Sequence, residues 1–179
     1  MAQAPGAMAE FDKLIRAVPD FPKPGILFRD ITPALEDPHA FREIIDLFAE
    51  RYAGKGITKV AGIESRGFIL ASALAYALSA GLVILRKPGK LPRETVSASY
   101  ALEYGESTLH LHTDAIHPKD KVIIMDDLVA TGGTLAAAVK LVQGTRATLH
   151  ETAAIIELEA LAGRKALPAN VGLFTLLTY

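Results

Sequence analysis

The stretch VIIMDDLVATGGT at residues 122–134 constrains the fold of this chain more than any other part of its sequence. Four apolar residues at its start predict a strand that is buried on both faces, as in a parallel sheet. Asp126 and Asp127 stand at the carboxyl end of this strand, and the turn of residues 131–134 then opens an alanine-rich helix predicted over residues 135–143. A strand, a glycine turn and a helix in this order indicate an α/β fold.

The glycine turn also predicts an anion site. The first backbone amides of a helix lack partners within the helix, and the positive end of its dipole attracts negative charge. Gly132 and Gly133 let the backbone approach an anion closely, and the hydroxyls of Thr131 and Thr134 can donate to a phosphate. The two preceding aspartates would repel a phosphate, but they suit neutral hydroxyls or a metal ion beside it. Together these groups indicate a phosphorylated sugar.

An ordinary strand, acidic turn and helix of an α/β protein is the alternative, because Gly-Gly turns are common. The complete set of strand, aspartate pair and Thr-Gly-Gly-Thr turn favours the phosphate-sugar site. Two other nucleotide motifs do not fit. The chain has no G-x-x-x-x-G-K-[ST] sequence, and Gly54-x-Gly56 lacks the third glycine of a dinucleotide fingerprint.

Composition narrows the class of protein. The 179 residues suffice for one domain with a full core, and 50% hydrophobic with 22% charged residues predicts a globular chain. Cysteine is absent, which excludes disulfides and thiolate metal sites and is compatible with a reducing compartment. A formal charge of −1 gives no overall attraction to nucleic acid or anionic membranes. We therefore expect a cytoplasmic protein with no nucleic-acid or membrane partner.

We expect no targeting signal in the first residues of this sequence. Residues 1–9 lack the basic start and apolar core of a signal peptide, so we expect them to form a flexible leader. The longest apolar stretch, residues 68–80, is too short to cross a bilayer.

Helices and strands are predicted to alternate along the chain. Residues 11–18 predict a short amphipathic helix ended by Pro19, and the prolines of residues 19–25 predict irregular structure there. Asp37 and Pro38 suit the N-cap and first position of a helix that runs to about residue 52. Further strands are predicted at residues 58–63, 82–85, 121–125, 148–158 and 171–177, and further helices at residues 67–79 and from residue 134.

This alternation predicts the α/β class, with a doubly wound, mainly parallel sheet flanked by helices. Ligands of such sheets gather at the carboxyl ends of the strands, where the aspartate pair is placed. Residues 87–114 depart from the pattern: residues 100–104 and 107–112 alternate around Gly105 and predict a hairpin or flap. His110 and His112 share one face of that hairpin, but without a third ligand they are better interpreted as surface residues than as a metal site.

Two basic segments predict a second anion site. The loop Glu64-Ser65-Arg66-Gly67 follows a predicted strand and opens a helix, so its amides and Arg66 could bind a pyrophosphate. A capped turn with a solvated arginine is the alternative. A basic cluster, which is usually a solvated loop, follows the next strand and consists of Arg86, Lys87, Lys90 and Arg93. The placement of both segments beside a sugar-phosphate site favours pyrophosphate binding.

Five segments resemble, in order, the type I phosphoribosyltransferase family: residues 21–31, 62–68, 86–92, 99–105 and 122–134. The Phe-Pro-x-Pro-Gly arm and the Tyr-x-Leu-Glu-Tyr-Gly flap resemble the adenine-specific members. The resemblance covers about residues 11–179 and implies one domain over residues 1–179, with a base-binding arm at about residues 10–35 and a flap at about residues 87–114. It implies transfer of a phosphoribosyl group from 5-phosphoribosyl 1-pyrophosphate (PRPP) to adenine, giving AMP and pyrophosphate, in a homodimer.

The resemblance also implies a role for individual residues. The 5′-phosphate would bind Ala130, Thr131, Gly132, Gly133 and Thr134. Pyrophosphate would bind Arg66, Arg86, Lys87 and Lys90, near a non-proline cis peptide at Glu64–Ser65 or Ser65–Arg66. Adenine would bind Leu27, Phe28, Arg29 and Leu128. The catalytic residues would be Glu103, Asp126 and Asp127, with both aspartates on the ribose and Mg²⁺ bound through substrate oxygens and water.

Two other functions stay open. The accepted base could be another purine, namely hypoxanthine, guanine or xanthine. A non-enzymatic PRPP sensor that controls transcription would need a DNA-reading helix-turn-helix and a basic surface, for which this chain has neither the length nor the charge.

Overall fold

The computed structural model describes residues 7–101 and 106–179. The chain divides into two compact units, Met1–Phe48 and Ala49–Tyr179, and each is considered by itself. The expected assignment of residues 1–179 to one domain stays a prediction. None of the described helices combines the length and the apolar character that crossing a membrane requires.

The first unit contains short elements and the beginning of one long helix. These elements are α1 (Ala7–Asp12), β1 (Arg16–Pro19), β2 (Leu27–Asp30), α2 (Thr32–Glu36) and α3 (Pro38–Tyr52), which continues into the second unit. The predicted start of α3 is confirmed: Asp37 Oδ1 accepts hydrogen bonds from the backbone amides of His39 and Ala40, each at 2.9 Å. An aspartate in this position satisfies amides that have no partner within the helix.

The helix predicted for residues 11–18 is wrong. Phe11 and Ile15 are buried with helical spacing, but α1 ends at Asp12 and residues 16–19 form a strand. β1 pairs with β2 in an antiparallel hairpin, in which Arg16 is opposite Asp30 and Pro19 is opposite Leu27. Strand pairing with residues 27–30 thus outweighs the helical spacing of the apolar residues. Residues 7–9, which we expected in a flexible leader, belong to α1, and residues 1–6 lie outside the described part of the chain.

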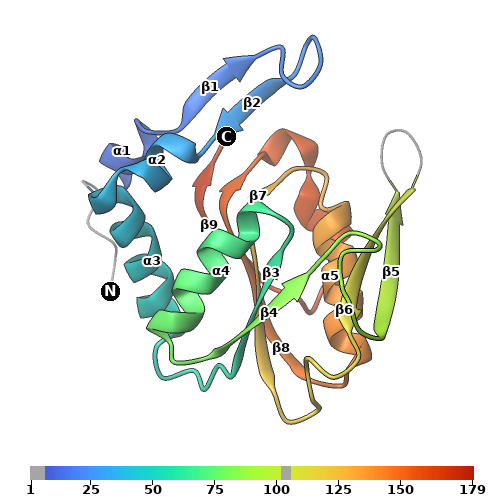
Figure 1. Ribbon diagram of the computed structural model, residues 1–179. Helices are drawn as coiled ribbons and strands as arrows, with labels where there is room; N and C mark the ends of the chain where they lie inside the picture. Colours follow the sequence, from blue (N-terminus) through green and yellow to red (C-terminus); the bar gives the residue numbers. More distant parts are fainter. Residues whose placement is uncertain (1–6, 102–105) are drawn as a thin grey trace. The chain divides into compact units, whose positions relative to one another are not determined.

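The second unit is built around a five-stranded sheet with the strand order β4-β3-β7-β8-β9 (Figure 1). All neighbouring strands are parallel, which confirms the predicted α/β class. The strands are β3 (Lys59–Ile63), β4 (Gly81–Leu85), β7 (Lys121–Val129), β8 (Thr148–Glu157) and β9 (Leu173–Thr178). The aliphatic residues that predicted β7 are fully buried, as expected for a central parallel strand.

Two helices cover the sheet. α4 (Arg66–Ala77) packs on β3, β4 and β7, while α5 (Gly133–Gly144) packs on β7 and β8. The core beside α5 includes Ala61 and Ile63, whereas Gly62, which lies between them on β3, faces Ala71 of α4. Because successive residues of a strand point to opposite faces, the two helices cover opposite faces of the sheet.

The predicted flap hairpin is present in the described residues on either side of residues 102–105. β5 (Thr95–Ala101) and β6 (Glu106–His112) are antiparallel, with Thr95 opposite His112. Leu109 and Leu111 of β6 belong to the core beside α5, so the base of the hairpin is fixed by packing. Two short 3₁₀ helices, η1 (Glu159–Leu161) and η2 (Gly163–Ala166), connect β8 to β9.

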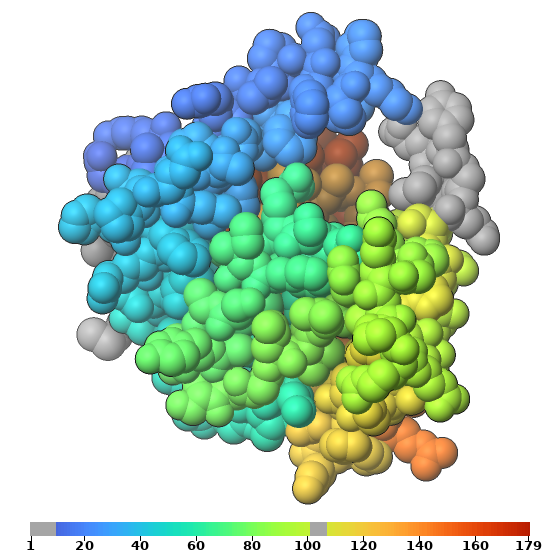
Figure 2. Space-filling view, viewed as in Figure 1, coloured from blue at the N-terminus to red at the C-terminus, as the bar shows by residue number. Residues whose placement is uncertain are grey.

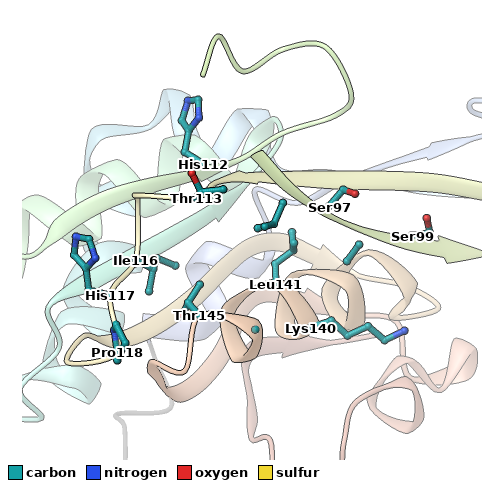
Figure 3. A pocket seen from close by; sticks show the side chains of 13 residues that line it. Ser97, Ser99, His112, Thr113, Ile116, His117, Pro118, Lys140, Leu141 and Thr145 are labelled. Carbon is teal, nitrogen blue, oxygen red and sulfur yellow. The ribbon is translucent and has the colours of Figure 1, made fainter. Parts of the chain in front are cut away.

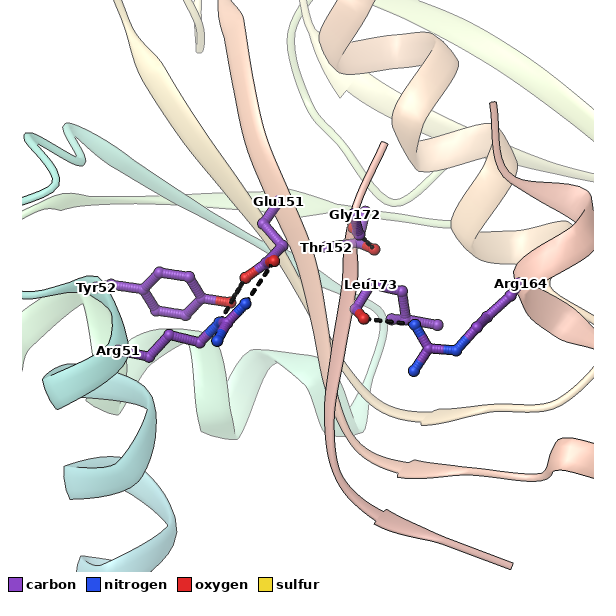
Figure 4. A network of polar contacts seen from close by, with 7 residues as sticks. All are labelled: Arg51, Tyr52, Glu151, Thr152, Arg164, Gly172 and Leu173. Atoms are coloured by element: carbon purple, nitrogen blue, oxygen red, sulfur yellow. Dashed lines mark hydrogen bonds and ion pairs between the residues drawn. The ribbon is translucent and has the colours of Figure 1, made fainter. Parts of the chain in front are cut away.

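A polar network connects the end of α3 to β8 (Figure 4). Arg51 donates two hydrogen bonds to the Glu151 carboxylate, both at 2.7 Å, and the Tyr52 hydroxyl donates a third at 2.9 Å. The Arg51 guanidinium also stacks on the Phe174 ring of β9 at 3.9 Å. Burial alone would raise the pKa of Glu151, but the hydrogen bonds from Arg51 and Tyr52 outweigh it and lower that pKa below its ordinary value.

We expect Glu151→Gln to lower the free energy of unfolding by about 1–3 kcal/mol at neutral pH, because it removes the charge that Arg51 and Tyr52 bind. A lowered pKa stabilises the folded state above the carboxylate's unfolded pKa, and that contribution is lost as pH falls through the folded pKa. Urea unfolding of both proteins at several pH values should therefore show a difference that shrinks in acid. A constant difference across pH would contradict the role of this charge, and the exposed Glu159→Gln serves as the control.

Candidate active site

The predicted site residues of the second unit lie at the carboxyl ends of strands β3, β4 and β7 or in the segments that follow them. Ile63 is paired with Leu85 of β4, and Gly62 is paired with Met125 of β7. The segments after these positions begin with Glu64, Arg86 and Asp126. Parallel pairing in this register therefore places the acidic and basic groups side by side at the carboxyl edge, where ligands of open α/β sheets bind.

The aspartate pair lies within β7. We expected the strand to end at residue 125, but it continues to Val129, and Asp126 is still paired with Ala154 of β8. Asp127 is buried and Asp126 is partly buried; Asp126 Oδ1 accepts a hydrogen bond from the Asp127 amide at 2.9 Å. Burial, and then the adjacent Asp127 charge, raise the pKa of Asp126 well above its usual range. Both effects act in the same direction, because each disfavours the ionised form of Asp126.

Arg66 contacts this pair directly. Its Nε donates to Asp127 Oδ2 at 2.5 Å, and 43% of its side chain remains exposed while that of Asp127 is almost fully buried. A guanidinium suits this position because it binds carboxylates and phosphates with the same planar set of donors. The residue predicted for pyrophosphate thus lies against a residue predicted for ribose.

Close packing of α4 on β7 produces that contact. A Cβ added at Gly67 would meet the Met125 carbonyl oxygen at 2.8 Å and Asp126 Oδ1 at 3.0 Å. Real Cβ atoms do not approach so closely, so only glycine allows the first turn of α4 to lie on the aspartate pair. The loop of residues 64–67 is held against β7 for this reason.

The loop between β7 and α5 forms a small concave site. Gly132 has φ +80°, a left-handed conformation that favours glycine, and its carbonyl accepts the first backbone hydrogen bond of α5 from Ala136. A cavity of about 100 Å³ is lined by Asp126 and residues 128–135. It contains all five residues predicted to bind the 5′-phosphate, together with Leu128.

A second glycine, which sequence reasoning missed, supports this loop from behind. A Cβ on Gly132 would clash with the carbonyl oxygen of Gly163, and a Cβ on Gly163 would clash with the Ala130 carbonyl oxygen. The neighbouring Arg164 donates to Glu157 Oε2 at 2.8 Å and to the Leu173 carbonyl at 2.6 Å, as Figure 4 shows for Leu173. These contacts attach η2 to β8 and β9 and fix Gly163 against the loop.

The basic cluster is connected to the loop after β3. Glu64 Oε2 accepts hydrogen bonds from the Lys87 amide at 2.8 Å and from Arg86 Nε at 3.2 Å. The peptide bond between Glu64 and Ser65 is cis, which confirms the expected non-proline cis peptide. Arg86 is partly buried, and Lys87 and Lys90 are exposed.

The remaining predicted residues belong to the first unit or lie outside the described part of the chain. Leu27, Phe28 and Arg29 form most of β2 in the first unit, where the Phe28 ring packs edge-on against Phe21 at 5.1 Å. Glu103 lies outside the described residues. The binding roles of these four residues stay predictions.

A larger cavity of about 600 Å³ lies between the flap hairpin and the second half of α5 (Figure 3). Its lining includes Ser97 of β5, His117 of the loop after β6, and Leu141 of α5. Among the described residues that were predicted for the site, none lines it. The five residues predicted for the 5′-phosphate instead line the much smaller cavity at the amino end of α5.

We expect Gly132→Ala to destabilise the protein by about 1–3 kcal/mol and to abolish tight binding of a phosphomonoester. The added methyl group meets the Gly163 carbonyl, and alanine disfavours the left-handed backbone. Gly144→Ala, on the same helix, is the matched control, because its Cβ would enter open space. Urea unfolding and calorimetric titration with ribose 5-phosphate measure both effects. Equal behaviour of the two variants would contradict the assigned role of Gly132.

Comparison with known proteins agrees with this geometry. Residues 32–171 match the model of the phosphoribosyl transferase domain. The adenine phosphoribosyltransferase of Anaeromyxobacter dehalogenans is 56% identical over 165 residues, which cover 92% of this chain and 95% of that protein. The crystal structure of the Rhodothermus marinus adenine phosphoribosyltransferase has a TM-score of 0.93 at 50% identity, covering 97% and 98% of the two chains. The Saccharomyces cerevisiae enzyme, solved with adenine and a bisphosphate ligand, has a TM-score of 0.92 at 40% identity, covering 97% and 100%. The chain belongs to the phosphoribosyltransferase family, and within it to the adenine phosphoribosyltransferases.

Proposed function

We propose that this protein transfers the 5-phosphoribosyl group from PRPP to adenine, giving AMP and pyrophosphate. The proposal rests on three groups that lie at one edge of the sheet. They are the loop between β7 and α5, the aspartate pair, and a cluster of arginines and lysines. These groups match the phosphate, the ribose and the pyrophosphate of PRPP. The names of the relatives and the adenine bound to the yeast enzyme support adenine as the base.

The charges at this edge suit the bond changes of the reaction. A purine nitrogen forms a bond to C1′ of the ribose while the bond between C1′ and the pyrophosphate oxygen breaks. Positive charge develops on the ribose and negative charge on the leaving group. Asp126 and Asp127 accept hydrogen bonds from the ribose hydroxyls and stabilise the positive charge, and Arg66 neutralises the departing pyrophosphate. Since Arg66 already pairs with Asp127, pyrophosphate competes with that aspartate for one guanidinium.

The remaining roles in this proposal rest on the sequence resemblance. The backbone of Leu27 and Arg29 and the side chains of Phe28 and Leu128 recognise adenine. Glu103, on the flap, assists the reacting base nitrogen. Arg86, Lys87 and Lys90 neutralise pyrophosphate with Arg66. The cytoplasmic location expected from the cysteine-free composition also stays a prediction.

Mg²⁺ is proposed as the metal that accompanies PRPP. Within residues 7–101 and 106–179, no group of three histidine, aspartate or glutamate side chains is arranged as a metal site. In this proposal the Mg²⁺ ion keeps substrate oxygens and water as its ligands, with at most an indirect contact to Asp126 or Asp127. When bound, the ion supplies positive charge that screens the pyrophosphate.

We propose a homodimer whose interface includes the outer face of α4 and the edge strand β4. This surface exposes Ile69 and Tyr76 of α4 and Leu82 of β4, with exposed fractions of 46%, 88% and 44%. Figure 2 shows α4 and β4, in green, on the face turned toward the viewer. A helix face and a sheet edge that expose large apolar side chains together are typical of an interface between subunits.

Incubation with PRPP, Mg²⁺ and a panel of free bases should give a nucleotide product with adenine alone. Asp127→Asn should lower kcat/KM by about 10²–10³ in a protein that still folds, because it removes a charge that acts in the transition state. Asp46→Asn, at an exposed position of α3, is the control. Preferential use of hypoxanthine, guanine or xanthine would replace adenine as the substrate. PRPP binding without turnover of any base would favour a sensor.

Ile69→Glu should dissociate the dimer, because a buried unpaired charge at a subunit interface is costly. Sedimentation equilibrium should give twice the chain mass for the wild type and a lower mass for the variant. Lys140→Glu, at an exposed position of α5 on the other side of the sheet, should leave the mass unchanged. A monomeric wild-type protein, or a dimer that survives Ile69→Glu, would contradict this interface.

A further inference from the structure

Glu64 places a carboxylate inside the group of cations that we assign to pyrophosphate. Only 15% of its side chain is exposed, and it lies between the end of β3 and the loop after β4. An anion in this position would repel pyrophosphate if it faced the ligand. Its hydrogen bonds instead go to the Lys87 amide and to Arg86 Nε, so its charge is directed at the protein.

Arg86 is the point at which three segments meet. Its backbone amide donates to the His110 carbonyl at 3.0 Å, and its own carbonyl accepts from the His110 amide at 2.7 Å. His110 belongs to β6 of the flap hairpin. The Arg86 side chain donates through Nε to Glu64 and through Nη1 to the Lys90 carbonyl at 3.2 Å. One residue thus joins the loop after β3, the basic loop and the base of the flap.

The electrostatics favour an ionised Glu64. Burial alone would raise its pKa, but the Lys87 amide and the Arg86 guanidinium outweigh burial and lower that pKa below its ordinary value. Hydrogen bonds to a charged acceptor are stronger than neutral ones, so this carboxylate fixes both donors firmly. The protein itself thus supplies the contacts that orient the Lys87 backbone and the Arg86 side chain.

We propose that Glu64 is a positioning residue for the pyrophosphate end of PRPP. It does not touch the substrate; it fixes Arg86 and the start of the basic loop relative to Arg66, and it connects the pyrophosphate site to the flap through Arg86 and His110. This inference rests on the proposed function and adds to it a residue whose charge is opposite to that of its neighbours. Preorganised donors bind a ligand more tightly because less ordering is needed on binding.

The test compares Glu64→Ala and Glu64→Gln with the wild type. Glu64→Ala should raise the KM for PRPP, and the KM for pyrophosphate in the reverse reaction, by about 10- to 100-fold, the loss expected for charge-assisted hydrogen bonds. The KM for adenine should change by less than about twofold, since the Glu64 carboxylate binds Arg86 and the Lys87 amide, neither of which is assigned to adenine. Glu64→Gln should restore part of the loss, because its amide oxygen still accepts from the Lys87 amide.

Glu151→Ala is the matched control. Glu151 also pairs with an arginine and has the same exposed fraction, 15%, but it lies in the network at the end of α3. Its removal should lower stability and leave every KM unchanged. If Glu64→Ala does not fold, the KM values of Glu64→Gln decide the outcome.

Two results would overturn the proposal: an unchanged KM for PRPP in folded Glu64 variants, or equal increases in the KM values for PRPP and adenine. Failure of the proposed function would appear differently, as a wild-type protein that makes no nucleotide from PRPP. In that case calorimetric titration with magnesium pyrophosphate still tests the role of Glu64. Weaker binding by Glu64→Ala than by Glu151→Ala would support the positioning role, and equal binding by the two variants would refute it.

Discussion

Parallel pairing of β3 with β4 and β7 is the constraint on which the rest of the site depends. The register aligns Ile63 with Leu85 and Gly62 with Met125, so the segments after β3 and β4 leave the sheet at the level at which β7 reaches its aspartate pair. A parallel sheet directs all of its carboxyl ends to one edge, and the chain must return over a helix before each new strand. Groups far apart in sequence are therefore collected at one place by backbone hydrogen bonds, before any side chain contributes.

Charge compensation then organises that edge. Arg66 is paired with Asp127, and Glu64 is paired with Arg86, so both arginines predicted to bind pyrophosphate have a carboxylate partner in the protein. The two carboxylate partners, Asp127 and Glu64, have different effects on the site. The Arg66 partner belongs to the predicted ribose site, so pyrophosphate and ribose share one network of charge. The Arg86 partner faces inward and connects the basic loop to the flap. Both arrangements reduce the repulsion among clustered cations and keep their donors oriented toward the edge.

The parts of the fold that were predicted correctly rest on local chemistry. The apolar run at residues 122–125 gave the central strand, and Asp37 with Pro38 gave the start of α3. The errors arose where distant pairing decides the structure. Residues 16–19 pair with β2 although Phe11 and Ile15 have helical spacing, and β7 continues through the aspartates because β8 extends beside it. Gly163 escaped prediction because its importance lies in contacts with Gly132 and Ala130, which are distant in sequence.

The sequence by itself determined which chemistry is possible: a glycine turn at the start of a helix, an aspartate pair before it, and two basic segments after other strands. These are properties of single segments, and local backbone and side-chain preferences suffice to recognise them. The tertiary structure decided which groups meet: that Arg66 reaches Asp127, that Glu64 binds Arg86 and Lys87, and that Gly163 supports the loop between β7 and α5. Such contacts depend on strand order, register and close packing, which no local preference encodes.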